Sequence, residues 1–304
     1  MDEQSRQLLK EQLKFINLLL KHRQVSKLLS SFLEPFDTFI QSDGRIRPHF
    51  HNTVCVTGRL SCSAPNVEQL PKDNEIAPVR NLFICDRDNI FIVADYSGQE
   101  LRILGEETQD PTLVKALIAG LDLHQLNADE FGLSRNEAKS ISFGVAYGKQ
   151  AYGFAKDFGC SQVEAQQFLD KFFNKFPVVR TRIEKCREQV YRKGYVVNKS
   201  GRRRRFPDFH KGSKWQKERC YRQAFNFLIQ SYAADMIKVA AAKVIQDTNL
   251  KLVNIIHDEL VVECNKNYIE QGKQWIEKCM INAVKMCIPL ELDFGTGERY
   301  GEAK

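Results

Sequence analysis

The spacing of hydrophobic residues predicts helices and short strands in a mixed order. Apolar residues between positions 5 and 35 recur at helical intervals, which indicates one long or two broken amphipathic helices ended by Pro35. Residues 44–62 are strand-like and rich in turns, whereas residues 65–89 are polar and irregular. Residues 90–95 form an apolar run typical of a buried strand, and we expect a helix to follow it.

Most of the remaining chain is predicted to be helical, with one hairpin near its end. A broad helical region runs from residue 111 to residue 192 and is interrupted at Gly120, Gly132, Gly159 and Pro177. The elements expected after it are, in order, a loop or hairpin over 194–214, a helix over 216–247, a hairpin over 252–264, a helix over 267–287 and a strand over 289–294. Because helices and strands follow one another irregularly, the sequence predicts the α+β class.

The composition is that of an ordinary globular protein with a mild basic excess. The 304 residues include 45 Lys and Arg against 38 Asp and Glu, a formal net charge of +7, which is compatible with a polyanionic partner. There is no run of about 18 apolar residues that would predict a membrane span, and the polar, acidic N-terminus does not resemble a signal peptide. The nine cysteines contain no CxxC pair, so we expect reduced thiols in a cytoplasmic protein.

One group of metal-ligating residue types needs a separate interpretation. It consists of His49, His51, Cys55 and Cys62. Their spacing fits no standard zinc site, so we interpret them as scattered structural residues.

Two aspartates stand at the ends of apolar runs that lie far apart in the sequence. Asp95 ends the strand-like run, and Asp258 lies between His257 and Glu259 in the predicted hairpin turn, with apolar runs on both sides. An ionised carboxylate is costly to desolvate, so acids at these positions indicate a specific need. Two strand-end aspartates that meet in the fold would suit a two-metal phosphoryl-transfer site. Taken separately, Asp95 is equally well explained as a helix N-cap and Asp258 as a turn residue.

A third segment, residues 134–148, predicts a helix with one distinctive face. Ser134 and Glu137 form a capping box that begins the helix. The residues that then recur every four positions are Arg135, Lys139, Phe143 and Tyr147. Two cations followed by two aromatic rings suit a nucleotide, with its phosphates at the basic end. The alternative is an amphipathic helix with its aromatic residues in the core and its cations in solvent.

Together and in this order, the three segments resemble motifs A, B and C of the family A DNA polymerases, the class of bacterial DNA polymerase I and several phage replicases. The matching segments are residues 95–102 (DYSGQELR), residues 135–148 (RNEAKSISFGVAYG) and residues 257–259 (HDE). Further segments that resemble motifs of the family lie at residues 57–71, 122–124, 201–208 and 226–235. The resemblance runs from about residue 20 to the C-terminus.

The resemblance implies a right-hand polymerase core with an antiparallel-sheet palm, helical fingers and a reduced helical thumb. The implied divisions are a thumb remnant over 1–43, palm over 44–108, fingers over 109–214 and palm again over 215–304. The implied reaction is template-directed addition of deoxynucleotides to a primer 3′ end, with primer-template DNA and deoxynucleoside triphosphates as partners. The expected location is the cytoplasm of a bacterial or phage-infected cell, or another compartment that contains DNA.

The resemblance also implies a metal site. Asp95 and Asp258 would hold two Mg²⁺ ions, for which Mn²⁺ could substitute, and the carbonyl of Tyr96 would be a further ligand. Glu259 would be a supporting acid in catalysis. One ion would activate the primer 3′-hydroxyl, and the other would bind the triphosphate and the leaving pyrophosphate.

Residues that contact the substrates are implied by position. The triphosphate would be bound by His124, Arg135 and Lys139, of which Lys139 is also assigned to catalysis. The sugar and the new base pair would meet Phe143, Tyr147 and the steric gate Glu100, which excludes a ribose 2′-hydroxyl. The residues at DNA-contacting positions are Arg59, Arg222, Asn226, Gln230 and His257. The arginine run 202–205 is explained equally well as a phosphate contact and as a solvated loop.

The chain departs from the family pattern in two respects. Gly98 and Gln99 stand where bacterial members have Gln and Ile; Gly98 is similar to some phage members, and the polar Gln99 puts fidelity in doubt. Little of the exonuclease domain and long thumb that normally precede this region is seen. We therefore expect no proofreading, and a processivity factor or a separate exonuclease or thumb subunit as partner.

Two other functions compete with this one. A single-subunit RNA polymerase shares the architecture, but Glu100 and Glu259 argue against it because the related RNA polymerases lack that gate. An inactive DNA-binding accessory subunit is the second alternative, and the presence of Asp95, Asp258 and Lys139 argues against it.

Overall fold

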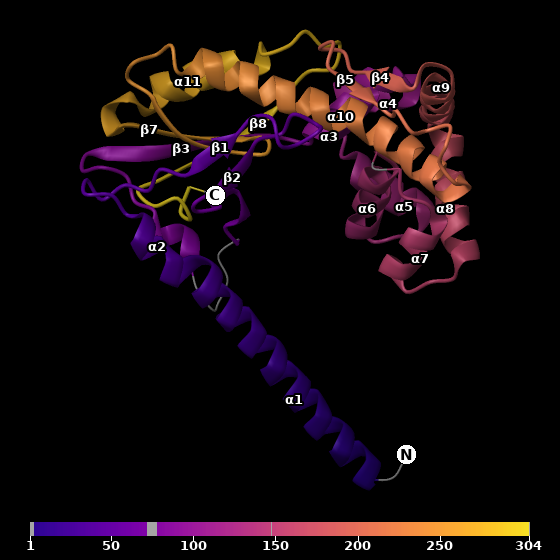
Figure 1. Ribbon diagram of the computed structural model, residues 1–304, viewed down its shortest axis with the longest axis horizontal. Coiled ribbons are helices and arrows are strands. Elements are labelled where there is room, and N and C mark those ends of the chain that lie inside the picture. Colours follow the sequence, from indigo (N-terminus) through magenta and orange to yellow (C-terminus); the bar gives the residue numbers. More distant parts are fainter. Residues whose placement is uncertain (1–2, 72–77, 147, 304) are drawn as a thin grey trace.

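The computed structural model describes residues 3–71, 78–146 and 148–303, apart from the side chains of residues 3–11, 143 and 146. Figure 1 shows a body built on a β-sheet, a helical lobe beside it, and the long helix α1 (Glu3–Leu28), which projects from the body. Helix α10 (Lys214–Val244) runs from the lobe into the body and connects them. In the described part of the chain, no helix has both the length and the apolar character needed to cross a membrane.

The remaining elements are short to medium in length. The other α-helices are α2 (Glu34–Phe39), α3 (Gln99–Thr108), α4 (Pro111–Ile118), α5 (Leu123–Phe131), α6 (Arg135–Ala146), α7 (Ala151–Phe158), α8 (Gln162–Lys175), α9 (Pro177–Lys193) and α11 (Ile269–Ile281). The strands are β1 (His49–His51), β2 (Ser61–Ser63), β3 (Asn89–Tyr96), β4 (Tyr195–Val197), β5 (Arg203–Arg205), β6 (Lys251–Ile256), β7 (Glu259–Asn265) and β8 (Leu292–Gly297). The short helical segments of other types are η1 (Leu29–Leu33), η2 (Val67–Gln69), η3 (Val79–Leu82) and η4 (Lys266–Tyr268).

The body is built on a four-stranded antiparallel sheet with the strand order β6-β7-β3-β8. Both faces of β3 are covered, which explains its apolar sequence. Ile92 and Ala94 face a large core that includes α3, α10 and α11, whereas Phe91 and Val93 face a second core formed with α2, β2 and the C-terminal residues. This alternation follows the two-residue period of a strand. The predicted α+β class is confirmed.

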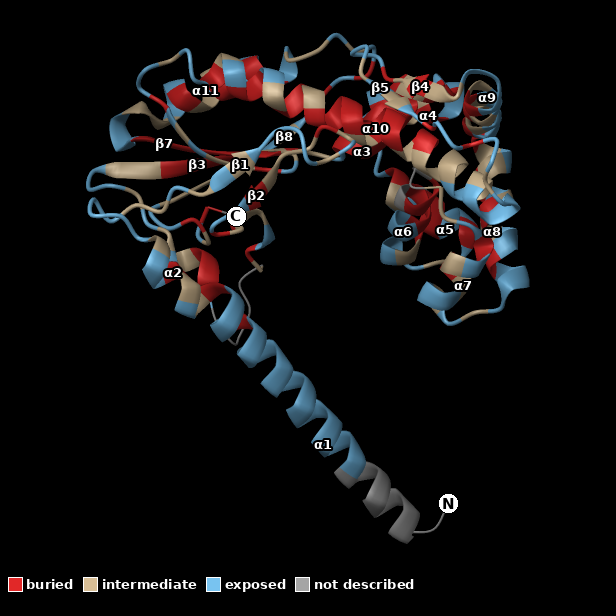
Figure 2. Ribbon diagram, in the orientation of Figure 1, coloured by how far each residue is buried: buried red, intermediate tan, exposed pale blue. Residues whose placement is uncertain are grey.

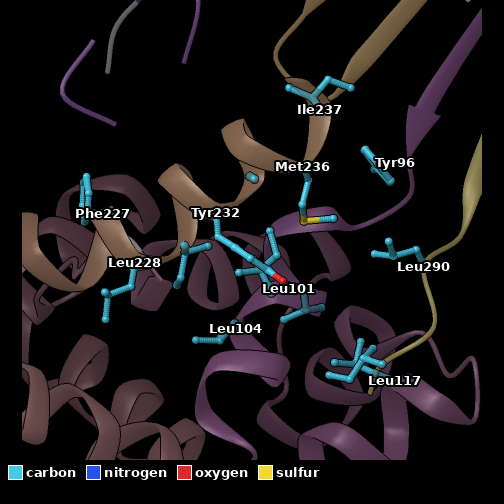
Figure 3. Close-up of a cluster of buried hydrophobic side chains, with 14 of the residues drawn as sticks. Tyr96, Leu101, Leu104, Leu117, Phe227, Leu228, Tyr232, Met236, Ile237 and Leu290 are labelled. Atoms are coloured by element: carbon cyan, nitrogen blue, oxygen red, sulfur yellow. The ribbon is translucent and has the colours of Figure 1, made fainter. Parts of the chain in front are cut away.

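Helix α10 supplies much of the large core. Its first turn is closed by a capping box at Ser213, so it begins slightly before the predicted residue 216 and ends at 244 rather than 247. Figure 3 shows Tyr232 and Met236 of α10 together with Leu101 of α3, and Tyr96 of β3 lies in the same cluster. Helix α3 follows β3 directly in the chain and packs against α10. This packing fixes the start of α3 at the end of the sheet.

Helix boundaries in the lobe follow the predicted glycine and proline positions. Gly132 ends α5 with a φ of 71°, and α9 begins at Pro177. Asp110 is fully buried, and its carboxylate accepts hydrogen bonds from the N–H of Leu113 at 3.2 Å and of Val178 at 2.9 Å. One carboxylate therefore ties the N-termini of α4 and α9 together.

Helix α1 projects from the body with the side chains of residues 12–27 in solvent, as the pale blue ribbon of Figure 2 shows, whereas its last residue, Leu28, is buried. Its exposed large apolar side chains include Leu13, Phe15, Ile16, Leu18, Leu19, Leu20 and Val25. The prediction that Pro35 ends this helix is wrong. The π-helical segment η1 joins α1 to α2, and Pro35 lies in the first turn of α2, where a backbone N–H is not needed. Phe32 and Phe36 then anchor the junction in the second core.

Two boundaries near the C-terminus also differ from the prediction. Helix α11 ends at Ile281 rather than about 287, because the side-chain amide of Asn282 donates to the carbonyl of Lys278 at 2.8 Å and caps the last turn. Strand β8 begins at Leu292 rather than 289. Pro289 has no N–H for a strand ladder, and its carbonyl accepts from Arg102 at 2.6 Å instead.

Candidate active site

The ends of β3 and of the β6–β7 hairpin lie together at one end of the sheet. Asp95, the last residue but one of β3, pairs with Glu259 of β7 and with Asp293 of β8. The backbone N–H of Tyr96 donates to the carbonyl of Asp258 at 3.3 Å. Directly paired residues of antiparallel strands have side chains on the same face, about 4.5–5.5 Å apart at Cβ. Acidic residues from three strands and one turn therefore gather around the end of β3.

The turn between β6 and β7 is tighter than predicted. Ile256 pairs with Glu259, so His257 and Asp258 are the two turn residues. His257 has a φ of 54°, in the left-handed region that tight hairpin turns use. The prediction that Glu259 belongs to the turn is wrong, because it is the first residue of β7. There it is 1% exposed and accepts a 2.7 Å hydrogen bond from the hydroxyl of Tyr300.

The alternative explanation of Asp95 as a helix cap is also wrong. The N-cap of α3 is Gly98, which has a φ of 62°, and no side chain caps this helix. Glycine adopts such a conformation without steric cost, so the local backbone explains why position 98 is a glycine. Asp95 lies within the strand, and its role as a metal ligand stays a prediction.

His51, Cys55 and Cys62, in or near β1 and β2, take part in local contacts. Nε2 of His51 lies 2.8 Å from Oγ of Ser63 across the β1–β2 pair, and the thiol of Cys62 donates to the carbonyl of Pro65 at 3.3 Å. Within the described ranges, no group of three or more His, Cys, Asp or Glu side chains is arranged to hold a metal ion.

Glu100, in the first turn of α3, is held by Arg59. Nη2 of Arg59 donates to Oε1 of Glu100 at 2.7 Å, and the glutamate side chain is 9% exposed. Arg59 also lines a small pocket together with Glu68, Ala234 and His257. Burial raises the pKa of Glu68, and the charge of Arg59 opposes that shift. Arg59 therefore joins the predicted gate residue to the pocket beside the hairpin turn.

Helix α6 begins at the predicted capping box. The N–H of Ser134 donates to Oε2 of Glu137 at 2.8 Å, and the N–H of Glu137 donates to Oγ of Ser134 at 3.3 Å. The two cations of the predicted triphosphate site, Arg135 and Lys139, are exposed on this helix. Nε of Arg135 also donates to the carboxylate of Asp122 at 2.8 Å. Figure 1 shows α6 on the side of the lobe that is turned toward the sheet.

His124 lies near these cations. It is in the first turn of α5, where its N–H donates to Oδ1 of Asp122 at 3.0 Å. Burial lowers the pKa of His124, and the charges of Lys139 and Arg135 lower it further against the opposing charge of Asp122. The side chain of Phe143 and all of Tyr147 lie outside the described residues.

The predicted DNA-contacting residues of α10 share one face of that helix. Arg222, Asn226 and Gln230 recur every four residues and are half-buried. Ala234 and Ile237 continue the face and line the small pocket beside Arg59. At about 1.5 Å per residue, the face spans about 22 Å from the lobe to the end of the sheet.

Arg222 also lines a cavity of about 580 Å³ in the helical lobe. The other basic and aromatic side chains around this cavity include Lys149, Tyr152, Phe173, Arg180, Arg187 and Tyr221. Arg180 lies over the ring of Phe173 at 4.8 Å, and Arg187 lies over the ring of Tyr221 at 4.5 Å. This cavity could not be predicted from the sequence, because its lining comes mainly from five helices, α6 to α10, that only packing brings together.

The first arginine of the run 202–205 is half-buried and is paired with α10. Arg202 donates to Oδ1 of Asp235 on α10 through Nη2 at 2.6 Å and Nε at 3.0 Å. Its guanidinium also packs against Gly58, where a Cβ would lie 2.6 Å from Cζ of the arginine. The φ of 77° at Gly58 favours glycine there, whereas the end of the Arg202 side chain could shift to make room for a Cβ.

Of the other three arginines of the run, one contacts α10 and two are exposed. Arg204 is half-buried and donates to Oε1 of Gln223 at 2.8 Å. Arg203 and Arg205 are exposed on β5. Neither a solvated loop nor a phosphate contact therefore describes the whole run, because Arg202 and Arg204 make contacts with α10.

The antiparallel sheet and the adjoining helical lobe have the architecture of a right-hand polymerase core. The family model described as DNA polymerase family A matches residues 1–302. The chain is 34% identical over 303 residues to the thermostable DNA polymerase I of Thermus filiformis, covering 95% of this chain and 36% of that protein. It is 33% identical over 302 residues to DNA polymerase I of Pseudomonas aeruginosa, covering 94% of this chain and 33% of that protein.

Among solved structures, the polymerase domain of Pol1 from M. smegmatis, in complex with DNA primer-template and dNTP, superposes with a TM-score of 0.90 at 31% identity. The match covers 100% of this chain and 56% of that one. The chain belongs to DNA polymerase family A. It spans about a third of the length of the curated relatives it matches. Both of those relatives are bacterial, and the phage origin suggested by Gly98 stays a prediction.

Proposed function

We propose that the chain is the nucleotidyl-transfer core of a DNA-directed DNA polymerase, which adds deoxynucleotides to a primer 3′ end. The observation that carries the proposal is the meeting of Asp95 with the turn that contains Asp258, at one end of an antiparallel sheet. Membership of DNA polymerase family A supports template-directed DNA synthesis. The complex formed by the structurally similar M. smegmatis domain supports primer-template DNA and a dNTP as substrates.

The residues at the end of β3 fit a pair of Mg²⁺ ions. Mg²⁺ usually takes one or two protein carboxylates and completes its octahedron with water and substrate phosphates, so the site does not require a third acidic side chain. Asp95 and Asp258 would hold the ions, or Mn²⁺ in their place, with the carbonyl of Tyr96 as a further oxygen ligand. Bound ions of this kind make a hydroxyl more nucleophilic and neutralise charge on a phosphate leaving group.

The proposed triphosphate site is formed by α5 and α6. Arg135 and Lys139 are exposed cations on one face of α6, so phosphate oxygens can reach both. Lys139 would stabilise the charge that develops on the leaving pyrophosphate, which is its proposed catalytic role. His124 would donate a hydrogen bond from a neutral imidazole, in keeping with its lowered pKa. Contacts of Phe143 and Tyr147 with the sugar and the base pair stay predictions.

Glu100 is the proposed steric gate against ribonucleotides. A carboxylate that is buried and ion-paired has little freedom to turn away from an added 2′-hydroxyl. The ion pair with Arg59 therefore supports the gate, since a mobile side chain would discriminate poorly.

The proposed DNA path follows α10. Arg59 and His257 lie beside the small pocket at the end of the sheet, where primer and template would pair. Asn226 and Gln230 continue along α10 to Arg222 and the larger cavity. Cations and aromatic rings in one cavity suit an unpaired template base, because bases stack on rings without regard to sequence. The DNA contacts of Arg59, Arg222, Asn226, Gln230 and His257 are all proposals.

We extend the proposal to the division of the chain and to its partners. The sheet body would be the palm, over 44–108 and 215–304, the helical lobe the fingers, over 109–214, and residues 1–43 part of a thumb. The exposed apolar side chains of α1 support a protein partner, either a processivity factor or a separate exonuclease or thumb subunit. Absence of proofreading and a cytoplasmic location stay predictions.

A primer-extension assay with purified chain tests the proposal. A labelled primer on a longer template is incubated with Mg²⁺ and deoxynucleotides, with ribonucleotides, or without nucleotides. We expect extension with deoxynucleotides alone and no shortening of the primer without nucleotides. Extension with ribonucleotides at an equal rate would favour an RNA polymerase, and DNA binding without any extension would favour an accessory subunit.

A further inference from the structure

The C-terminal segment after β8 turns back onto the sheet and reaches Glu259. The hydroxyl of Tyr300 donates to Oε1 of Glu259 at 2.7 Å, and the two residues are 3% and 1% exposed. A buried hydrogen bond to a carboxylate is among the stronger kinds in proteins, so it fixes the oxygen that accepts it. Because Glu259 is the direct strand partner of Asp95, this bond constrains the side chain beside the proposed metal ligand.

Glycines in β8 allow the C-terminal segment to approach this closely. A Cβ at Gly295 would lie 1.9 Å from the carbonyl oxygen of Ala303, and a Cβ at Gly297 would lie 2.9 Å from the Ala303 nitrogen. These are backbone atoms, which cannot move aside as the end of a flexible side chain can. The segment is therefore held against β8, where Tyr300 and Ala303 belong to the second core.

The ring of Tyr300 is also held by the segment around η3. The guanidinium of Arg80 lies 5.3 Å from the ring centroid, and its Nε donates to the carbonyl of Pro71 at 3.0 Å. The backbone N–H of Tyr300 donates to the carbonyl of Phe83 at 3.0 Å. Tyr300 is thus contacted both on the face of its ring and at its backbone N–H, so the position of its hydroxyl is well defined.

We propose that Tyr300 is a positioning residue for nucleotide transfer, whose hydroxyl holds the carboxylate of Glu259 beside Asp95. The inference rests on the proposed polymerase function, and it assigns a part in that function to a residue outside every motif of the sequence analysis. Without the hydroxyl, Glu259 would keep its place in β7 but gain freedom in its side chain. A displacement of about 1 Å near reacting groups can cost about 100-fold in rate, so the expected effect falls on catalysis.

The test compares Tyr300→Phe with a matched control, Tyr268→Phe. The hydroxyl of Tyr268 also donates to a carboxylate, that of Asp247 at 2.8 Å, away from the proposed active site. In single-turnover addition of one nucleotide, we expect Tyr300→Phe to lower the maximal rate by about 10- to 100-fold. We expect the nucleotide concentration for half-maximal rate and the Kd for primer-template to change less than about threefold. Tyr268→Phe should keep the wild-type rate, and thermal unfolding should show both variants folded.

Two further measurements separate positioning from a general structural effect. If Tyr300 acts through Glu259, then adding Tyr300→Phe to Glu259→Gln should slow the reaction no further, whereas independent effects would multiply. Binding of Mn²⁺, followed by electron paramagnetic resonance in a complex whose primer lacks a 3′-hydroxyl, should weaken several-fold in Tyr300→Phe and not in Tyr268→Phe.

A wild-type rate and Mn²⁺ affinity in Tyr300→Phe, or multiplied effects in the double variant, would overturn the positioning role. That result differs from failure of the proposed function itself. If the wild-type chain adds no nucleotide, the polymerase proposal fails; if the wild type is active and Tyr300→Phe matches it, only the role of Tyr300 fails.

Discussion

Arg59 and Glu100 form a part-buried ion pair in which Nη2 of the arginine lies 2.7 Å from Oε1 of the glutamate. The pair joins the segment before β2 to the first turn of α3. A charged side chain with so little exposure loses hydration, and an ion pair offsets part of that loss. Arg59, a residue 41 positions earlier in the chain, therefore helps to hold the Glu100 side chain.

Substitution of this pair should change the choice of sugar. Glu100→Ala opens space for a 2′-hydroxyl, so we expect the ratio of kcat/KM for a ribonucleotide to that for the matching deoxynucleotide to rise about 10- to 100-fold. Arg59→Ala keeps the Glu100 side chain but removes the ion-pair partner that holds it, so the same ratio should rise less. Single-nucleotide addition with both substrates measures the ratio. No change in Glu100→Ala would mean that this turn of α3 is not the wall of the nucleotide site.

Loss of either Asp95 or Asp258 should stop the chemistry and spare DNA binding. Asp95→Asn and Asp258→Asn each remove a charge that would hold Mg²⁺, and loss of several kcal/mol of transition-state stabilisation corresponds to about 1,000-fold or more in rate. Fluorescence anisotropy should give a Kd for primer-template close to wild type. Asp88→Asn is the control, because Asp88 is exposed next to the opposite end of β3. Substantial single-turnover activity in either of the first two variants would contradict the metal assignment.

The exposed arginines and the paired arginine of the run 202–205 should differ in their effects on DNA binding and on stability. Arg203→Ala or Arg205→Ala should reduce the slope of log K against log salt for DNA binding by about 1 if that residue contacts a phosphate. Arg202→Ala should leave the slope unchanged but lower the free energy of unfolding by about 1–3 kcal/mol, because it removes the charged partner of Asp235. Salt titrations and urea unfolding separate the two effects. A changed salt slope in Arg202→Ala would show that this arginine also reaches DNA.

The lowered pKa of His124 should make stability depend on pH. Burial, its main cause, disfavours the charged imidazole in the folded state. As the pH falls below about 6.5, the ordinary pKa of histidine, the unfolded chain therefore binds the proton first. The contribution is fully present above that pH and is lost as the pH falls toward the lower folded-state pKa. Urea unfolding at several pH values should show this loss, and it should be smaller in His124→Gln. Identical pH profiles would mean that His124 does not cause the dependence.

The local features of the fold could be predicted because neighbouring residues determine them. The capping box of Ser134 and Glu137, the glycine that ends α5 and the buried strand before Asp95 all rest on hydrogen bonds or periodicity within a few residues. The hairpin around Asp258 was likewise visible as two apolar runs with acids between them. These patterns were enough to indicate the α+β class and the resemblance to family A polymerases.

Other features depend on pairing between distant strands or on packing between helices, which no local pattern contains. The register of β6 with β7 places Glu259 inside the sheet instead of in the turn. Packing of α10 turns Arg202 from a surface charge into a partner of Asp235. The close approach of the C-terminal segment to β8 brings Tyr300 to Glu259, 41 residues away. The sequence by itself thus determined which residues could carry the chemistry, whereas only the tertiary structure decided which of them are held in place and by what, because those contacts form between segments that approach one another only in the fold.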